Sequence, residues 1–390
     1  MRVVIVGAGI GGLTAAIALR RAGIDAVVLE RAPELREVGA GISLWPNAIN
    51  AFRRLGIGDA VEAAGTRVGD TVIGDWRGRA LHQSSSDLVE ARFGAPLVMI
   101  RRAALHAVLV QSLGEDFLRV DTQCLSFEQD LDGVRLRLAD GGTEHCDVAI
   151  GADGLHSVMR AGTVGDGAPR RSGVQAWRAI ASVDGQLADQ IQVGEFWGKG
   201  SLFGVQSLGG GAFYWYAASS RNGAQDGTDA KPGLLRLFNS WAAPVSTLIE
   251  ATTGPILCND LYDRRVPSVL AFGRVALLGD AAHPMLPSLG QGACQAVVDG
   301  EVLAEALAET DDPAAGLRLY SDRRRRTASL AVTQSRRMFK VAHARSPVTV
   351  GLRNALLRRA SQETSLSRMA PIIEGDRREN VGVDANGGPS

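Results

Sequence analysis

Cysteine is scarce in this chain of 390 residues, and its spacing argues against the sites that depend on it. The four cysteines are widely separated and include no C-x-x-C pair; they are Cys124, Cys146, Cys258 and Cys294. This pattern does not fit a zinc site or a disulfide framework. We therefore expect reduced thiols, no metal site and a cytoplasmic location.

The sequence also lacks a net charge and a long apolar segment. It has 42 basic and 42 acidic residues, so no overall field would attract nucleic acid or acidic lipid. No uninterrupted apolar run approaches the roughly 20 residues that span a membrane. The arginines at 323–326 lie on a predicted helix beside Asp322, which favours a solvated helix face over a nucleic-acid site. We expect a small-molecule partner, no nucleic acid and no membrane, and a monomer or homodimer.

The first thirty residues do carry a distinct pattern of strand, turn, helix and strand. Short apolar, β-branched runs occupy 3–6 and 26–30, and helix-forming residues fill 13–21 between them. The glycines of the turn match the spacing G-x-G-x-x-G; they are Gly7, Gly9 and Gly12. In this context the pattern is typical of a Rossmann unit that binds a dinucleotide.

Each residue of the pattern has a physical role in such a site. Gly7 permits the tight turn, Gly9 lets the backbone approach a pyrophosphate, and Gly12 allows the helix and strand to pack closely. The helix N-terminus supplies amide donors and positive potential. Glu30, 23 positions after Gly7, can accept hydrogen bonds from ribose hydroxyls. The alternatives are simple turn glycines with a solvated strand end, and NAD instead of FAD as the ligand.

Two later segments decide between these ligands. Residues 151–160 read G-A-D-G-L-H-S-V-M-R, and residues 279–292 contain G-D-A-A-H-P followed by P-S-L-G-Q-G. Together with the glycine turn they resemble the para-hydroxybenzoate-hydroxylase-like, or group A, FAD-dependent monooxygenases. The resemblance extends over about residues 1–369 and implies FAD bound by a single Rossmann unit. Taken alone, the first segment could be a turn that caps a strand, and the second a closely packed helix start.

The resemblance also assigns cofactor roles to individual residues. It implies that Asp153 lies near the pyrophosphate, that Asp280 contacts the ribityl chain, and that Arg102 binds FAD, with Arg101 as the alternative register. Ser43 would line the cofactor through its backbone, and Cys124 would contact the adenine side. The predicted cofactor residues are Gly7, Gly9, Gly12, Glu30, Arg31, Ser43, Arg102, Cys124, Asp153, Asp280, Gly290, Gly292 and Ala293.

The reaction implied by the resemblance is oxygen insertion. NADPH or NADH reduces FAD, O2 adds at the flavin C4a carbon, and the hydroperoxide hydroxylates or epoxidises an aromatic or polycyclic small molecule. A reductase or oxidase on the same fold and a non-catalytic FAD-binding pathway partner are the alternatives. The catalytic acid or base is unknown, because phenol hydroxylation needs one and epoxidation need not. His283 is expected to be structural.

The order of apolar runs predicts an α/β protein with two sheets. We expect a Rossmann-type FAD-binding domain, a mainly antiparallel β-sheet substrate domain and C-terminal helices. The FAD-binding domain would comprise residues 1–70, 97–170 and 265–335, and the substrate domain 71–96 and 171–264. Residues 336–376 would form a C-terminal helical segment, and the polar residues 377–390 a disordered tail.

Aromatic residues are concentrated in the predicted second sheet, where they could line a pocket or form core. Alternate residues of a strand face opposite ways, so Phe213 and Trp215 face one side while Tyr214 and Tyr216 face the other. We predict substrate contacts for three aromatic residues and for one proline in the third motif: Trp177, Phe203, Trp215 and Pro287. Packing within the sheet is the alternative for the aromatic residues.

Residues 42–47 and 292–295 resemble the bacterial FAD-dependent urate and aromatic hydroxylases. In that subfamily an arginine on the second sheet and an acidic residue before G-Q-G engage the purine. The matching positions here are Leu202 and Ser288, and neither side chain can form an ion pair. The sequence therefore favours a less polar aromatic or polycyclic substrate over urate.

Overall fold

The strand, turn and helix predicted at the start of the chain form the middle of a six-stranded sheet. The computed structural model describes residues 1–35, 41–220 and 230–375. The strand order is β18-β19-β12-β1-β2-β8; β18 runs antiparallel to β19, and the other neighbours run parallel. The strands are β1 (Arg2–Val6), β2 (Asp25–Leu29), β8 (Leu118–Arg119), β12 (Val148–Gly151), β18 (Ala271–Phe272) and β19 (Val275–Leu277).

Helices cover this sheet, which explains why its central strand is apolar on both faces. Val3, Val4 and Ile5 of β1 are fully buried, as expected for a parallel strand covered on both sides. Helix α1 packs against α11. The helices of this half are α1 (Ile10–Arg21), α2 (Pro46–Arg54), α3 (Gly58–Ala63), α5 (Arg102–Leu113), η1 (Glu115–Phe117), α6 (Val158–Thr163), α10 (Gly279–Ala282), η2 (Pro287–Leu289) and α11 (Gly292–Ala308).

Two three-stranded antiparallel sheets accompany the six-stranded one. The sheet β11-β10-β9 is formed by residues between β8 and β12, and the sheet β3-β7-β4 lies near α2 and α5. Their strands are β9 (Cys124–Gln129), β10 (Val134–Leu138), β11 (Thr143–Cys146), β3 (Gly41–Leu44), β4 (Gly65–Arg67) and β7 (Val98–Arg101). The strands between residues 118 and 151 are thus divided between the six-stranded sheet and the sheet β11-β10-β9.

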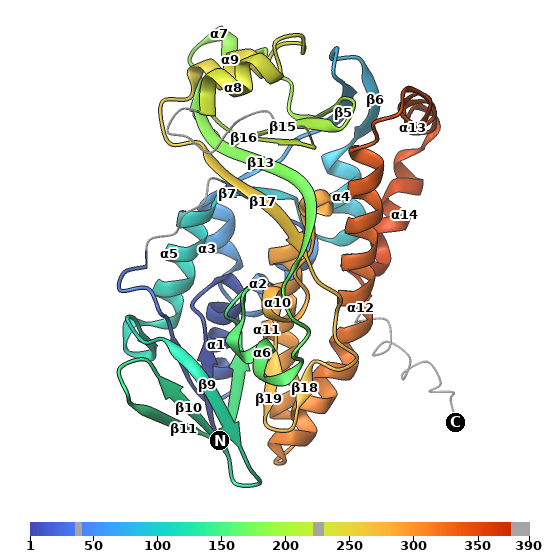
Figure 1. Cartoon of the computed structure of the whole chain (residues 1–390). Coiled ribbons are helices and arrows are strands. Elements are labelled where there is room, and N and C mark those ends of the chain that lie inside the picture. The colour runs from blue at the N-terminus through green and yellow to red at the C-terminus, as the bar shows by residue number, and fades with distance from the viewer. Residues whose placement is uncertain (36–40, 221–229, 376–390) are drawn as a thin grey trace, which may run out of the picture.

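The second large sheet has seven strands in the order β17-β13-β16-β15-β14-β5-β6. Strands β14 and β5 pair in parallel and the other neighbours pair antiparallel, so the sheet is mainly antiparallel as predicted. In Figure 1, α8 and α9 lie above this sheet and the Rossmann half lies below it. Its elements are β5 (Thr71–Asp75), β6 (Ala80–Ser84), α4 (Ser86–Phe93), β13 (Arg170–Ser182), α7 (Gln186–Asp189), β14 (Gly194–Trp197), β15 (Ser201–Ser207), β16 (Ala212–Ser219), α8 (Ala230–Leu237), α9 (Val245–Ala251) and β17 (Leu257–Asp263).

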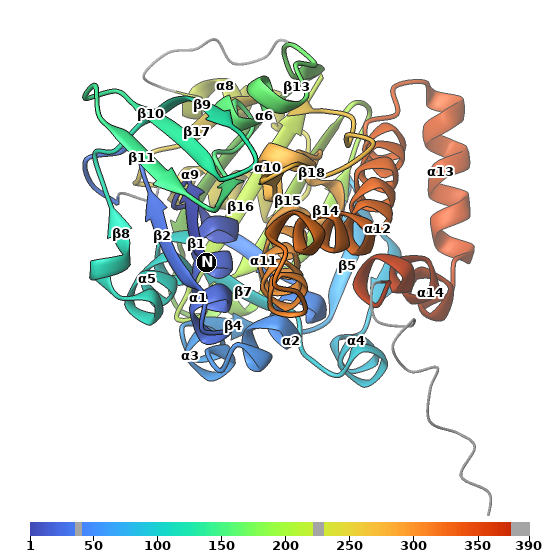
Figure 2. The same cartoon turned by 90° about the horizontal axis from the view of Figure 1, so that it is seen from below.

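Three helices end the described chain: α12 (Pro313–Ala342), α13 (Pro347–Arg359) and α14 (Gln362–Ile373). Helix α12 extends along the Rossmann half and up beside the seven-stranded sheet in Figure 1, and α13 lies at the outer edge of the molecule in Figure 2. Within the described ranges, none of the helices combines the length and the apolar character that a membrane span requires. The tail predicted at 377–390 lies outside the described residues.

Candidate functional site

The glycine turn between β1 and α1 has two crowded positions and one open position. A Cβ on Gly7, whose φ is 110°, would lie 2.5 Å from the carbonyl oxygen of Ala152. A Cβ on Gly12 would lie 2.0 Å from the carbonyl oxygen of Gly7, so both positions exclude a side chain. A Cβ on Gly9 would meet no protein atom within 4 Å. The open space beside Gly9, at the first turn of α1, is where a phosphate could approach the backbone.

Glu30 follows β2 directly and lies beside this turn. Its two carboxylate oxygens accept hydrogen bonds from the backbone amides of Ala8 and Ala32, each over 2.9 Å. The imidazole of His106 adds a second restraint, because its Nε2 lies 2.8 Å from the Ala8 carbonyl oxygen. Each carboxylate oxygen keeps a further lone pair, so ribose hydroxyls could also donate to Glu30. Its neighbour Arg31 is exposed.

Asp153 organises the turn that follows β12. Its carboxylate accepts hydrogen bonds from the Ser157 hydroxyl and from the Val158 amide, and the Ser157 hydroxyl in turn accepts one from the Arg160 amide at the start of α6. Burial raises the pKa of Asp153, although these hydrogen bonds oppose the shift. Cys124 lies close enough for the Asp153 charge to add to the effect of burial, which raises the thiol pKa to about 11. The Cys124 thiol is therefore protonated and unreactive near neutral pH.

Arg160 connects this turn to the third motif, a role the sequence pattern did not reveal. The side chain is buried, and its guanidinium donates hydrogen bonds to the carbonyl oxygens of Ala281, Ala282 and Arg265 over 3.0, 2.8 and 2.8 Å. It also forms an ion pair with Asp166. One side chain thus fixes two segments that are more than a hundred residues apart in the chain.

A buried network of charged side chains holds the third motif in place. His283 Nε2 lies 2.6 Å from Asp299 Oδ2, and the other carboxylate oxygen accepts a hydrogen bond from Arg324 over 2.7 Å. The amide of Gly279 also donates to Asp299. Burial would raise the pKa of Asp299, but the charges of His283 and Arg324 outweigh it and hold the pKa well below its usual range. His283 is engaged in the packing of its own motif, which agrees with the structural role expected for it.

Asp280 in α10 is exposed but closely surrounded by protein, and we call the surface around it the recess. Its side chain is exposed, yet enough protein surrounds it that burial raises its pKa, with His283 and Arg102 opposing the shift. Exposure combined with desolvation is the property of a concave surface. Arg102 begins α5 and also lies within electrostatic reach of Tyr214 on β16, whereas Arg101 is exposed at the end of β7. Of the two possible registers, the one with Arg102 brings an arginine to this recess.

The segment from Gly290 to Ala293, which leads into α11, lies against β3 at the same recess. Gly290 has a φ of 62°, and a Cβ there would lie 3.0 Å from Trp45 Nε1 and 4.0 Å from the Ser43 Cβ. Gly292 is the first residue of α11, and Ala293 follows it. The Cys294 thiol lies 3.6 Å from the Ser43 carbonyl oxygen and holds the loop against the strand. Pro287 begins the short helix η2 just before this loop.

The three aromatic residues predicted to contact substrate lie on the face of the seven-stranded sheet that α8 and α9 cover. The prediction of substrate contact is therefore wrong for all three. Trp177, Phe203 and Trp215 are 0% exposed and pack in one cluster with Phe238 of α8 and Leu248 of α9. The ring centroids of Phe203 and Trp215 are 5.4 Å apart in a stacked arrangement. These side chains form the core between the sheet and helices α8 and α9, so they pack within the protein and do not line a pocket.

The opposite face of the sheet is directed at the Rossmann half. Tyr214 is 8% exposed, and its Cγ would lie 2.7 Å from a Cβ on Gly41 of β3. Arg178 of β13 and Gln206 of β15 share this face by strand alternation, and Arg178 lies within electrostatic reach of Tyr214. Gln206 Oε1 is buried and has no hydrogen-bond partner among the described residues. Polar groups of this kind, set in an apolar wall, can orient a ligand.

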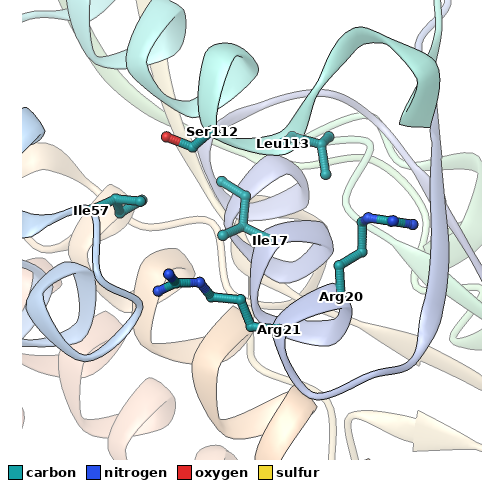
Figure 3. A pocket seen from close by; sticks show the side chains of 6 residues that line it. All are labelled: Ile17, Arg20, Arg21, Ile57, Ser112 and Leu113. Atoms are coloured by element: carbon teal, nitrogen blue, oxygen red, sulfur yellow. The ribbon is translucent and has the colours of Figure 1, made fainter.

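A separate hollow of about 340 Å³ lies near the far end of α1 and is unconnected with this chemistry (Figure 3). Its six lining residues are Ile17, Arg20, Arg21, Ile57, Ser112 and Leu113. The lining residues that belong to α1 lie roughly 15 Å along this helix from the glycine turn, at about 1.5 Å per residue. The Arg20 guanidinium is stacked on Phe117, with 3.1 Å between its central carbon and the ring centroid. The hollow brings together none of the motif residues.

The family model described as "FAD binding domain" matches residues 1–335, which include all three motifs. The chain belongs to the group A FAD-dependent monooxygenases. It is 40% identical over 366 residues to the aurachin C monooxygenase/isomerase of Stigmatella aurantiaca, over 93% of this chain and 95% of that protein. It is 35% identical over 353 residues to an FAD-dependent urate hydroxylase of Klebsiella pneumoniae subsp. pneumoniae, over 88% and 91% of the two chains.

A solved structure agrees with this assignment. The crystal structure of Klebsiella pneumoniae HpxO complexed with FAD and uric acid matches with a TM-score of 0.88 and 31% identity, over 96% of this chain and 97% of that one. The predicted family, fold class, FAD cofactor and monooxygenase activity are thereby confirmed. Dependence on NAD(P)H is typical of the family. FAD supplies the activation of O2 when bound and reduced, and the protein must orient the substrate and exclude water.

Proposed function

We propose that this monooxygenase inserts one oxygen atom into an aromatic small molecule held between FAD and the Tyr214 face of the seven-stranded sheet. The observation that carries this proposal is the composition of that face. It combines Tyr214 with two polar side chains, Arg178 and Gln206, at the recess that contains Asp280. The tyrosine ring suits an aromatic ligand, and the polar groups suit a ring oxygen or nitrogen.

The cofactor would extend from the glycine turn to the loop before α11. Gly9 and Glu30 would hold the adenosine diphosphate end, Arg102 and Asp280 would lie along the flavin side, and the Gly290 loop would approach the ring. We expect Cys124, Asp153, Ser43 and Arg31 to lie along this path. NADPH or NADH would bind transiently and donate electrons to FAD, a role that needs no second nucleotide site. We place the enzyme in the cytoplasm, as a monomer or homodimer.

Urate is not the substrate that this face favours. Leu202 lies on β15 in an apolar cluster with Trp197 and Phe339. This chain therefore has no arginine at the position of the urate-binding arginine. Ser288 in η2 offers a neutral hydroxyl instead of a carboxylate. Among the compounds named for the relatives, aurachin C and 3-amino-4-hydroxybenzoate are therefore better candidates than uric acid. Pro287, at the start of η2, would close one side of the substrate site.

The test is NAD(P)H oxidation by the FAD-loaded enzyme against aurachin C, 3-amino-4-hydroxybenzoate, quinolones, indoles, phenols and uric acid. We expect at least tenfold stimulation by an aromatic compound other than urate, with O2 consumed and little hydrogen peroxide released. Stimulation with stoichiometric peroxide would indicate an oxidase, and reduction without O2 consumption would indicate a reductase. FAD binding with no stimulation across the panel would favour the non-catalytic partner.

A further inference from the structure

A tyrosine and a glutamate meet across an intervening strand on the face that looks toward the Rossmann half. Tyr216 lies on β16 and Glu195 on β14, with β15 between them. The Tyr216 hydroxyl donates a hydrogen bond to Glu195 Oε1, and Trp197 Nε1 donates one to Oε2 over 2.8 Å. Two donors thus fix the orientation of the carboxylate.

The contact depends on the absence of a side chain at Gly204. Gly204 on β15 pairs in register with Tyr216 on one side and Glu195 on the other, so the three residues form one row across the sheet. A Cβ on Gly204 would lie 2.1 Å from Tyr216 Cζ. Because neighbouring strands are about 4.8 Å apart, the Tyr216 ring must lie flat over the middle strand to reach Glu195.

The row is adjacent to the groups already assigned to the substrate face. The ring centroids of Tyr216 and Tyr214 are 5.7 Å apart. Arg178 pairs in register with Tyr216 on the side away from Gly204. Tyr216 also packs against the apolar cluster that contains Leu286, from the loop after α10. The pair therefore lies between the proposed substrate contacts and the third motif.

A purely structural role does not account for the exposure of this pair. Both Glu195 and Tyr216 are only half-buried, unlike the fully buried aromatic residues on the other face. Within residues 1–35, 41–220 and 230–375, no cation forms an ion pair with Glu195. Burial of a carboxylate with no cation beside it is costly, so packing alone is a poor reason for Glu195 at this position. The pair instead combines restraint with access, as an acid or base needs.

The environment also prepares the pair for proton transfer. Burial raises the pKa of the Glu195 carboxyl, and the hydrogen bonds from Tyr216 and Trp197 oppose that shift. Burial and the charge of Glu195 raise the pKa of the Tyr216 phenol. Since the Tyr216 hydroxyl donates its proton to Glu195, the lone pairs of the phenol oxygen can accept a hydrogen bond from a second donor. A carboxylate with a raised pKa is the stronger base at the end of this chain.

We propose that Tyr216 and Glu195 form the acid–base pair of the substrate site, for an aromatic substrate with an acidic O–H or N–H group. The substrate proton passes to the Tyr216 oxygen while the phenolic proton of Tyr216 passes to Glu195 Oε1. The substrate O–H or N–H bond breaks, an O–H bond forms at Glu195, and a ring-conjugated anion remains; no electrons leave the substrate. Tyr216 touches the substrate, and Glu195 acts through it. The inference rests on the proposed function, because it places an aromatic molecule on this face.

The test uses 4-nitrophenol, whose visible absorption reports its ionisation, bound to the FAD-loaded enzyme across a range of pH. We expect bound probe to ionise about one pH unit lower than free probe, a tenfold shift in its ionisation equilibrium. Glu195→Gln keeps the hydrogen-bond acceptor and removes the base, and Tyr216→Phe removes the relay; both should abolish the shift and retain FAD.

The charged and titratable groups facing the pair are Tyr214, Arg178 and Arg353, which stacks over Trp197.

Three comparisons keep the outcome clear. 4-Nitroanisole, which cannot ionise, should bind the wild type and both variants with Kd values within twofold of one another. An unchanged shift in Glu195→Gln, or an equal loss of affinity for 4-nitroanisole in both variants, would overturn the acid–base role. The probe experiment needs no turnover, so it separates the pair from the reaction. If the shift depends on Glu195 but no compound stimulates NAD(P)H oxidation, the acid–base pair is supported and the proposed function is contradicted.

Discussion

At the level of single residues, the glycines of the first turn differ in what a side chain would meet. Gly12→Ala places a methyl group 2.0 Å from the Gly7 carbonyl oxygen, so helix and strand must separate. We expect the free energy of unfolding to fall by about 1–3 kcal/mol, the usual cost of overpacking. Gly9→Ala meets open space, so the apoprotein should keep its stability and lose FAD affinity. Denaturant unfolding of the two apoproteins and FAD titration distinguish the two effects.

Asp299 provides a second prediction at this scale. Asp299→Asn removes the carboxylate that lies between His283 and Arg324 in a buried site, which should cost about 3–5 kcal/mol at pH 7. Because Asp299 has a lowered pKa, its stabilising effect is full above the carboxyl's unfolded pKa and is lost as the pH falls toward the folded pKa. The difference between wild type and variant should therefore shrink on acidification below about pH 4. Asp312→Asn, at an exposed ion pair with Arg318, is the control and should change stability by less than about 0.5 kcal/mol.

Single residues also show why the face that meets the Rossmann half could not be predicted from the sequence. Strand alternation correctly separated Trp215 from Tyr214 on opposite faces of β16. Both faces are aromatic, so composition could not tell which of them meets the Rossmann half. That depends on α8 and α9, which cover the Trp215 face through contacts far along the chain.

At the level of elements, Arg160 joins the turn before α6 to the segment around α10. Arg160→Lys keeps the charge but cannot reproduce the hydrogen bonds to Ala281, Ala282 and Arg265 together. We expect a loss of about 2–3 kcal/mol in stability, within the range for buried groups left unpaired, and at least tenfold weaker FAD binding. Arg171→Lys, in an exposed ion pair with Asp260, should change neither. Equal FAD affinity in Arg160→Lys and wild type would show that the third motif holds its shape without this link.

Helices and strands were largely predictable because their signals are local. Pro46 is the first residue of α2, where its fixed φ suits a helix, and long runs of helix-forming residues make up α11 and α12. The pairing of Tyr216 with Glu195 was not predictable in this way. It requires the order and register of three strands, together with the glycine on the middle one, and no short pattern encodes that arrangement.

At the level of the whole molecule, the cofactor site draws on segments distributed along most of the chain. The glycine turn, the start of α5, the turn after β12 and the segment around α10 belong to one folded half. FAD that binds only this folded arrangement must stabilise it by mass action. At a free FAD concentration a hundred times the Kd, we expect a gain of about 2.7 kcal/mol over the apoprotein. Thermal unfolding at several FAD concentrations measures it, and a Tm independent of FAD would contradict a site assembled by folding.

The fate of O2 distinguishes oxygen insertion at the face that holds Tyr214 and Arg178 from an oxidase reaction. The most direct measurement is the mass of the product formed from a stimulating aromatic substrate with NAD(P)H under ¹⁸O-labelled dioxygen. We expect a product that carries one ¹⁸O atom, with slower formation and weaker substrate binding in Arg178→Ala. A product without the label, or labelled hydrogen peroxide as the sole oxygen product, would contradict it.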